Sequence, residues 1–363
     1  MPAVTTTPQY LLASNLSAVY IKTQSALGVW EDPTPAVPAP GTGYVGTNAV
    51  RVVGTPKFSV RGAGIIQRAD VMTPWGGNQS SKTGGLGWDV TLSTELLWEL
   101  GVDDVDPTLI AQTQLGPLFL ASPWNLNIGG YTTFEVQPLF FAEENRLTAA
   151  YAVQPFSIAY EEAGGKRFEA YDCVCVPKLS WEYGQKVMIE WTIKGKWRPV
   201  TFSLGVVPVY VAPDVQAPII GVNCTVSLTD FFENVNAVSK VTIDTGWAIN
   251  DVADFRETYG FGLGFINLAA SPSIELDVAD LTEASTAGGG EPDWTDAEAN
   301  TILTLLELVM DVGGYTIAFN LSNPQLASFP TPGETNSYRT NTLKFQGIPS
   351  STNSVMSWVF QSV

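Results

Sequence analysis

The chain has 363 residues, of which 45% are hydrophobic and 15% charged, and its 36 acidic and 18 basic side chains give a net charge of −18. This acid excess repels phosphate, so the composition argues against a protein that holds nucleic acid tightly. The absence of histidine removes the usual general base and the commonest metal ligand, which argues against an enzyme or a metalloprotein. The 33 glycines and 24 prolines predict a strand-rich fold with many turns.

The sequence shows no sign of secretion or membrane insertion. Its first residues contain neither a basic region nor a continuous apolar segment, and no apolar run approaches the roughly 20 residues that span a bilayer. The cysteines are Cys173, Cys175 and Cys224, an odd number that favours reduced thiols. We therefore expect a protein that is made in a cytosol and is not attached to a membrane.

Residues 1–44 predict an extended N-terminal arm. The stretch WEDPTPAVPAPGTG, from Trp30 to Gly43, is rich in proline and has no periodic apolar face. Two interpretations stay open, namely a solvated linker and an arm that lies on a neighbouring subunit.

The next segment alternates strands with a loop. Period-two alternation predicts strands at Ala49–Ile66 and Trp88–Leu100, separated by the polar, glycine-rich loop Gln67–Gly87. Pro107 suits the first turn of a helix, so a short helix is predicted from there to about Leu118. Residues 119–165, rich in proline and aromatic residues, are predicted as an insertion.

Residues 171–197, YDCVCVPKLSWEYGQKVMIEWTIKGKW, predict a β-hairpin. Apolar and polar residues alternate on both sides of the turn YGQ, which gives one buried and one exposed face. The Cys-x-Cys spacing fits neither a redox motif nor a zinc site, so both cysteines are interpreted as small core residues. The buried face is predicted to contain Trp181, Ile189 and Trp191, and the exposed face Glu182, Glu190, Thr192 and Lys194.

The second half repeats the order of the first. Strands are predicted at Ser239–Ile249 and Pro272–Leu281, with the loop Asn250–Gly264 between them. A helix is predicted over Asp293–Met310, because Thr295 and Glu298 form a capping box and apolar residues follow at helical spacing.

This repetition of strand, loop, strand and helix indicates a diverged tandem duplication. The predicted domains are residues 45–215, which include the insertion at about 119–165, and residues 216–363. The boundary is placed near the proline-punctuated segment Val211–Gly221.

No motif carries catalytic chemistry. GGNQSSKT, from Gly76 to Thr83, has Ser81 where a phosphate-binding loop needs glycine, and it joins two strands instead of opening a helix. Carboxylate pairs are frequent in a chain this acidic, and none has a distinctive context. We therefore expect no catalytic residue, no cofactor and no metal site.

Four stretches together resemble the major tail (tail tube) proteins of long-tailed, siphovirus-type bacteriophages. These stretches are Gly28–Val52, Gly87–Leu97, Tyr171–Trp197 and Val241–Val278, and none of them is a catalytic signature. The resemblance implies a tube fold, in which packed antiparallel β-sheets form a β-sandwich or barrel with a flanking α-helix.

The resemblance also implies a function and its partners. Subunits would form rings, and stacked rings would form the hollow tail tube that conducts DNA from the capsid to the host cell. The duplication favours trimers over hexamers. The implied partners are the tape-measure protein, the tail terminator and baseplate proteins, and double-stranded DNA that passes without specific binding. The implied location is the virion tail, assembled in the host cytoplasm. An acidic lining of the bore would let DNA slide.

By the same resemblance, the two glycine-rich loops reach the next ring, although they could also be mobile surface loops. The inter-ring candidates are Arg68, Asp70, Trp75, Asn78 and Lys82 from the first loop, and Asp251, Phe255, Arg256 and Tyr259 from the second. The exposed hairpin face of Glu182, Glu190, Thr192 and Lys194 would point to the bore or to a neighbouring subunit.

Two other functions fit the same composition. One is a β-sandwich module of a phage fibre that binds or cleaves glycans, and the other is a different virion component, such as a neck or decoration protein.

Overall fold

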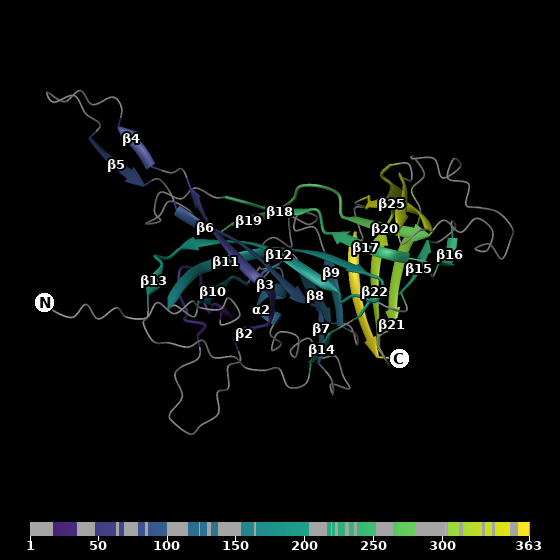
Figure 1. The fold of residues 1–363 in the computed structure, drawn as a ribbon, viewed down its shortest axis with the longest axis horizontal. Coiled ribbons are helices and arrows are strands. Elements are labelled where there is room, and N and C mark those ends of the chain that lie inside the picture. Colours follow the sequence, from purple (N-terminus) through teal and green to yellow (C-terminus); the bar gives the residue numbers. More distant parts are fainter. Residues whose placement is uncertain are drawn as a thin grey trace, which may run out of the picture.

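The computed structural model shows a mostly β protein built from antiparallel strands (Figure 1), as the composition predicts. It describes residues 17–34, 48–62, 65–68, 79–83, 86–99, 115–122, 124–128, 132–136, 154–162, 165–202, 216–218, 220–221, 224–228, 232–235, 238–251, 264–279, 302, 304–311, 315–328, 331–335, 338–348 and 355–362.

A run of eight antiparallel strands, here called the central sheet, forms the main layer of the fold. In spatial order these strands are β3 (Val52–Gly62), β6 (Leu86–Glu95), β12 (Met188–Trp197), β11 (Lys166–Glu182), β17 (Val238–Asp244), β20 (Ser273–Ala279), β25 (Tyr338–Gly347) and β24 (Thr331–Thr335). The short β23 (Pro324–Leu326) continues the line of β24 along β25.

The central sheet contains two sets of four strands with the same order. In the first set the chain visits β3, β6, β11 and β12, which lie side by side as β3-β6-β12-β11. In the second set it visits β17, β20, β24 and β25, which lie as β17-β20-β25-β24. Each set also carries a hairpin between its first two strands, β4 (Ile65–Arg68) with β5 (Gln79–Thr83), and β18 (Trp247–Asn250) with β19 (Phe265–Leu268).

The predicted hairpin at 171–197 is confirmed as β11 and β12. The pairing register shifts between Tyr171 and Val174, and Asp172 has a φ of 48°. Such a bulge bends a strand. Before it β11 pairs with β10 (Phe156–Glu161), and after it with β17, so β11 has different partners along its length.

The segment predicted as an arm enters the sheet. Residues Ala18–Thr23 form β1, which is mostly buried and pairs with β10 and with β2 (Ala49–Val50). β1 has no alternation of buried and exposed residues, because its first four residues are all buried.

A second sheet of seven strands forms the other layer. Its order is β16 (Phe232–Val235), β15 (Cys224–Leu228), β21 (Leu305–Asp311), β22 (Tyr315–Ser322), β26 (Met356–Ser362), β9 (Thr132–Val136) and β8 (Trp124–Ile128). Smaller pieces are β7 (Leu97–Glu99) with β14 (Gln216–Pro218), and β13 (Thr201–Phe202) beside β11. The predicted domain boundary near residue 215 lies outside the described residues, and both sheets contain strands from either side of it.

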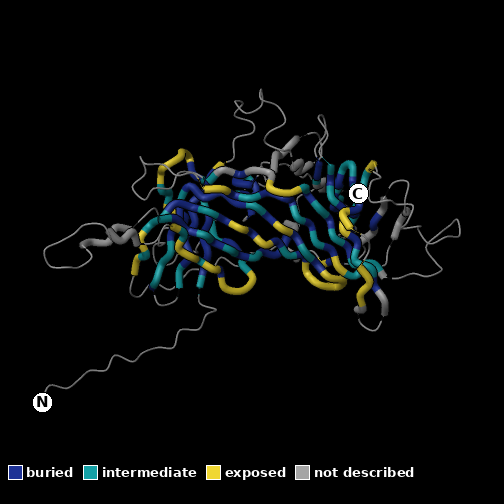
Figure 2. The backbone as a smooth tube through the Cα atoms, turned by 90° about the horizontal axis from the view of Figure 1, so that it is seen from above, coloured by how far each residue is buried: buried dark blue, intermediate teal, exposed yellow. Residues whose placement is uncertain are grey.

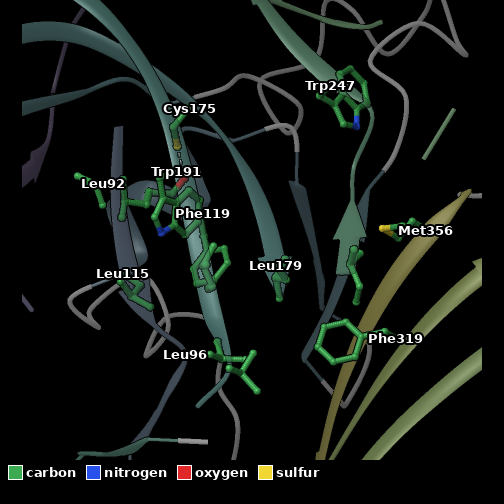
Figure 3. Packing of buried hydrophobic residues seen from close by; sticks show 14 of the residues in the cluster. Leu92, Leu96, Leu115, Phe119, Cys175, Leu179, Trp191, Trp247, Phe319 and Met356 are labelled. Atoms are coloured by element: carbon green, nitrogen blue, oxygen red, sulfur yellow. Dashed lines mark hydrogen bonds between the residues drawn. The ribbon is translucent and has the colours of Figure 1, made fainter. Parts of the chain in front are cut away.

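The core lies between the layers, where the buried segments gather (Figure 2). Trp191 is completely buried, donates from Nε1 to Thr94 Oγ1 at 2.9 Å, and packs edge-on against Phe119 at 5.3 Å between ring centroids (Figure 3). The ring centroids of Trp181 and of Phe319 in the second sheet lie 5.6 Å apart. Truncating a buried tryptophan of this kind costs about 3–5 kcal/mol.

The predicted helix Asp293–Met310 is wrong over Leu305–Asp311, which form β21. Leu306, Leu308 and Met310 are buried at period two, and the strand pairs with β15 and β22 on its two edges. A run this apolar satisfies both helical and strand spacing, and long-range pairing decides between them. Residues 293–301 lie outside the described residues.

The helix predicted from Pro107 to Leu118 also differs. The structure has a five-residue helix, α2 (Gly116–Leu120), with Pro117 in its first turn. Residues 107–114 lie outside the described part of the chain.

Candidate functional site

One face of the central sheet packs on the core, and the opposite face, here called the polar face, carries polar side chains. The cross-strand register places Glu190, Lys178 and Asp244 in one row of this face, and Thr242, Glu275 and Lys344 in another. Glu182, Glu190 and Thr192, predicted for the exposed hairpin side, are exposed, and Lys194 is partly buried. Trp181, Ile189 and Trp191 of the predicted core side are buried.

The polar face is mixed in charge. Acids and lysines face each other across strands, as Lys194 does with Asp89, and Lys344 with Glu275. Lys178 and Asp244 form an ion pair at 3.5 Å with side chains 51% and 47% exposed. Opposite charges paired in this way stabilise neighbouring strands by fractions of a kcal/mol and leave little net field.

The hairpin β18–β19 of the second set lies over the polar face of the first set. Asp251, which follows β18, binds Arg61 of β3 at 2.7 Å and Lys194 of β12 at 3.4 Å. A Cβ on Gly264 would lie 2.7 Å from Ile249 and 3.0 Å from Val174, so both side chains pack against that glycine.

This contact buries Val174 and Arg61. Val174 is 1% exposed although it belongs to the polar face, and the Arg61 side chain is 10% exposed. Arg61 also contacts Asp89 at 3.4 Å. Of the predicted candidates in this loop, the structure therefore gives Asp251 a defined partner set, whereas Phe255, Arg256 and Tyr259 lie outside the described residues.

The hairpin β4–β5 of the first set forms its own two-stranded sheet. Arg68 is the last residue of β4 and faces Gln79, and Lys82 lies in β5 opposite Ile66. Asp70, Trp75 and Asn78 lie outside the described residues. Figure 1 shows this hairpin standing off from the rest of the strands.

The central sheet ends in two edges. Among the strands that the structure describes, β3 pairs only with β6, and β24 only with β25. The β3 edge carries two exposed valines, Val53 at 42% and Val60 at 55%. An exposed edge strand with apolar side chains is a template for pairing with another chain.

A buried ion pair fixes the N-terminal segment to the bulge in β11. Asp172 Oδ2 lies 2.8 Å from Lys196 Nζ, and these side chains are only 1% and 8% exposed. The backbone N–H of Gly28 and the side-chain amide of Gln24 donate to Asp172 Oδ1 at 2.9 and 3.1 Å. The sequence prediction missed this arrangement, and its one signal was an acid inside an apolar run.

A second ionic cluster holds the same segment on β10 and β11. Arg167 contacts Asp32 at 2.7 Å, Glu161 at 3.4 Å and Glu169 at 2.6 Å. Burial raises the pKa of Asp32, but hydrogen bonds from Thr34 and Arg167 outweigh it and lower that pKa overall. The pKa of Glu161 is raised, chiefly by burial. Residues 24–34, here called the N-terminal strap, are therefore tied down by charge.

Glu31 is an acid of the strap with a strongly lowered pKa. Its carboxylate accepts from the Ser25 backbone N–H at 2.7 Å and contacts Lys22 at 3.1 Å. Hydrogen bonds from Ser25, with a smaller contribution from Lys22, lower the pKa of Glu31 from 4.5 to about 2.

The cysteines of the hairpin are packing residues. Cys173 and Cys175 are free and fully buried, and Cys175 Sγ donates to the Leu118 carbonyl at 3.0 Å. Burial raises the pKa of both thiols well above the ordinary value, and the Asp172 carboxylate raises the pKa of Cys173 further. A thiol that stays protonated is a poor nucleophile.

Among the described residues, no three Cys, Asp or Glu side chains are grouped in a way that could hold a metal ion. Within the same residues, no helix combines the length and the apolar composition needed to cross a bilayer. The sequence matches no protein-family model and no curated protein.

Proposed function

We propose that this chain is a non-enzymatic, self-assembling tail tube protein of a long-tailed phage, in which copies join edge to edge into rings that conduct DNA. The observation that carries the proposal is the matched strand order of the two sets, β3-β6-β12-β11 and β17-β20-β25-β24. A tandem duplication of one four-strand unit accounts for this order. Within the chain, β11 of the first set pairs with β17, the first strand of the second set.

The same junction can be repeated between copies. The free edge of β24 is the counterpart of β11, and the free edge of β3 is the counterpart of β17. If β24 of one copy pairs with β3 of the next, the head-to-tail contact continues the sheet and closes a ring when the rotation permits. The exposed Val53 and Val60 on β3 support an interface there.

Three copies give a bore of suitable size. Eight strands from each of three copies make a barrel of about 24 strands. With strands about 4.8 Å apart and tilted by about 40°, its backbone diameter is about 48 Å. Such a barrel leaves a wide channel, because barrels of about 16–18 strands already enclose water. A trimer of chains with two sets each would therefore form the same barrel as a hexamer of chains with one set each.

The part of the polar face that the hairpins leave open would line that bore. The buried face is occupied by the core, so Glu182, Glu190 and Thr192 would face the lumen in a closed ring. Acids and lysines that neutralise each other offer passing phosphates no sustained attraction, which suits DNA that must move. The tape-measure, terminator and baseplate partners, the tail location and assembly in the host cytoplasm follow from the family resemblance and belong to the same proposal.

Electron microscopy of the purified full-length chain tests the proposal. Negative staining should show rings or hollow tubes, and sedimentation should give species in multiples of three chains of 39.0 kDa each. A chain that stays monomeric at every concentration and salt condition would overturn the proposal. Rings with sixfold repetition of whole chains would overturn the trimer.

A further inference from the structure

The two hairpins of the repeat differ in one respect. The second-set hairpin, β18–β19, covers the polar face of the first set through Asp251, Arg61 and Lys194. The first-set hairpin, β4–β5, forms its own two-stranded sheet, which connects the end of β3 to the start of β6. Figure 1 shows both hairpins running the same way from their sheets, toward the left of the view. The described residues leave the equivalent surface on the second set open, so we look for its occupant in a neighbouring copy.

The equivalent surface follows from the pairing register. Asp89 and Lys194 face each other in the first set, and Glu275 and Lys344 do so in the second. Arg61 pairs with Gly87, two residues before Asp89, and Asp244 pairs with Ser273, two residues before Glu275. Asp244 therefore occupies the position of Arg61, and Lys344 that of Lys194.

Within the described part of the chain this surface is open, whereas its counterpart is covered. In the first set, Val174 lies opposite Lys194 and is 1% exposed. In the second set, Ala327 lies next to Lys344, because its N–H donates to the Lys344 carbonyl at 2.8 Å, and Ala327 is exposed. Lys344 is exposed too, and within the described part of the chain it forms no ion pair.

The charges at the two surfaces are interchanged. Asp251, the acid that binds Arg61, comes seven residues after Asp244 (251 − 244 = 7). Arg68, at the end of β4, comes seven residues after Arg61 (68 − 61 = 7). The first set thus has arginine both on its sheet and at its hairpin, and the second set has aspartate at both positions. The Arg61–Asp251 pair inside the chain would therefore have a counterpart with the charges interchanged, in which Asp244 lies on the sheet and Arg68 at the hairpin.

We propose that the β4–β5 hairpin of one copy docks on the polar face of the second set of a neighbouring copy, where its Arg68 pairs with Asp244 beside Glu275 and Lys344. The contact is lateral, within a ring, and it adds a side-chain clasp to the backbone pairing of β24 with β3. This inference rests on the proposed head-to-tail assembly. It explains why Asp244 keeps a half-exposed carboxylate, 47% exposed, despite its contact with Lys178.

Charge reversal on the full-length chain tests the clasp. Arg68→Asp and Asp244→Arg should each raise the concentration needed for assembly by about tenfold, since each places like charges together at the joint. The double variant should return that concentration to near the wild-type value. Lys240→Asp, on the same face but outside this surface, is the matched control and should leave assembly nearly unchanged.

A cross-link gives a readout that does not depend on the charge change. A photoreactive residue in place of Lys344 should cross-link to residues 65–83 of a second copy, recognised in mixtures of light and heavy isotope-labelled chains. The same group at Lys194 should cross-link within one chain to residues 249–264. Assembled rings in which the Lys344 position cross-links elsewhere, or in which the double variant fails to recover, would overturn the clasp while the ring stands. A wild-type chain that never assembles would overturn the proposed function and the clasp together.

Discussion

Replacing Lys196 by methionine removes the charge that faces the buried Asp172 while keeping most of the side-chain volume. The two groups lie 2.8 Å apart, and their side chains are 8% and 1% exposed. At an effective dielectric constant of about 20, unit charges at this separation attract by about 6 kcal/mol before their desolvation is counted. Removing one partner of a buried pair costs about 3–5 kcal/mol, because the other charge stays buried.

For Lys196→Met the lower end of that range is expected, about 3 kcal/mol, since the donors Gly28 and Gln24 remain on Asp172. Lys178→Met is the matched control. Its partner Asp244 is 3.5 Å away and both side chains are about half exposed, so a loss of about 0.2–1 kcal/mol is expected.

Urea unfolding, followed by the fluorescence of the 11 tryptophans at one subunit concentration, measures both variants. With a slope of about 3 kcal/mol per molar urea, Lys196→Met should lower the midpoint by about 1 M, and Lys178→Met by a third of that or less. Equal shifts for the two variants would refute the argument that burial makes the first pair costly to break. A second variant, Asp172→Asn with Lys196→Met, should recover much of the loss, because asparagine accepts the same hydrogen bond and tolerates a positive φ.

Three further outcomes are expected. Val53→Lys with Val60→Lys should keep the chain folded but monomeric, because added charge blocks the β3 edge, whereas threonine at both positions should still assemble in sedimentation. Unaltered assembly of the lysine variant would contradict edge pairing. The lowered pKa of Glu31 means that its strap contact is complete above pH 4.5 and is lost as the pH falls toward about 2. Limited proteolysis of the strap should therefore increase only over that acid range, and Glu31→Gln should remove the increase. Replacing residues 69–78 by a two-residue turn should give single rings that do not stack in electron micrographs, and normal tubes from this deletion would rule out an inter-ring role for the loop.

The local pattern of apolar and polar residues predicts a strand correctly where one face of the strand is buried and the other is exposed to solvent. Alternation in residues 171–197 predicts the hairpin and separates Trp191 from Glu190, because the period of a strand is two and solvent acts on one side only. It also places the strands that precede and follow each glycine-rich loop.

The local pattern does not predict the secondary structure where both sides of a segment are buried or where the apolar run is short. Residues Ala18–Thr23 are buried without alternation, and Leu305–Asp311 satisfy two periods at once. Nothing local distinguishes a helix from a strand there, so the partners β15 and β22 decide. The buried ion pair at the Asp172 bulge is likewise not visible in the sequence, because the Lys196 that pairs with Asp172 lies on the next strand.

The sequence by itself determined that the protein is mostly β and acidic, and it predicted a repeat of strand, loop and strand in its two halves. Only the tertiary structure decided how the halves are joined, which face of the sheet is polar in both, and that Asp251 of one half binds Arg61 of the other. The physical reason is that composition and periodicity act over a few neighbouring residues, whereas strand order and charge pairing join residues nearly 200 positions apart.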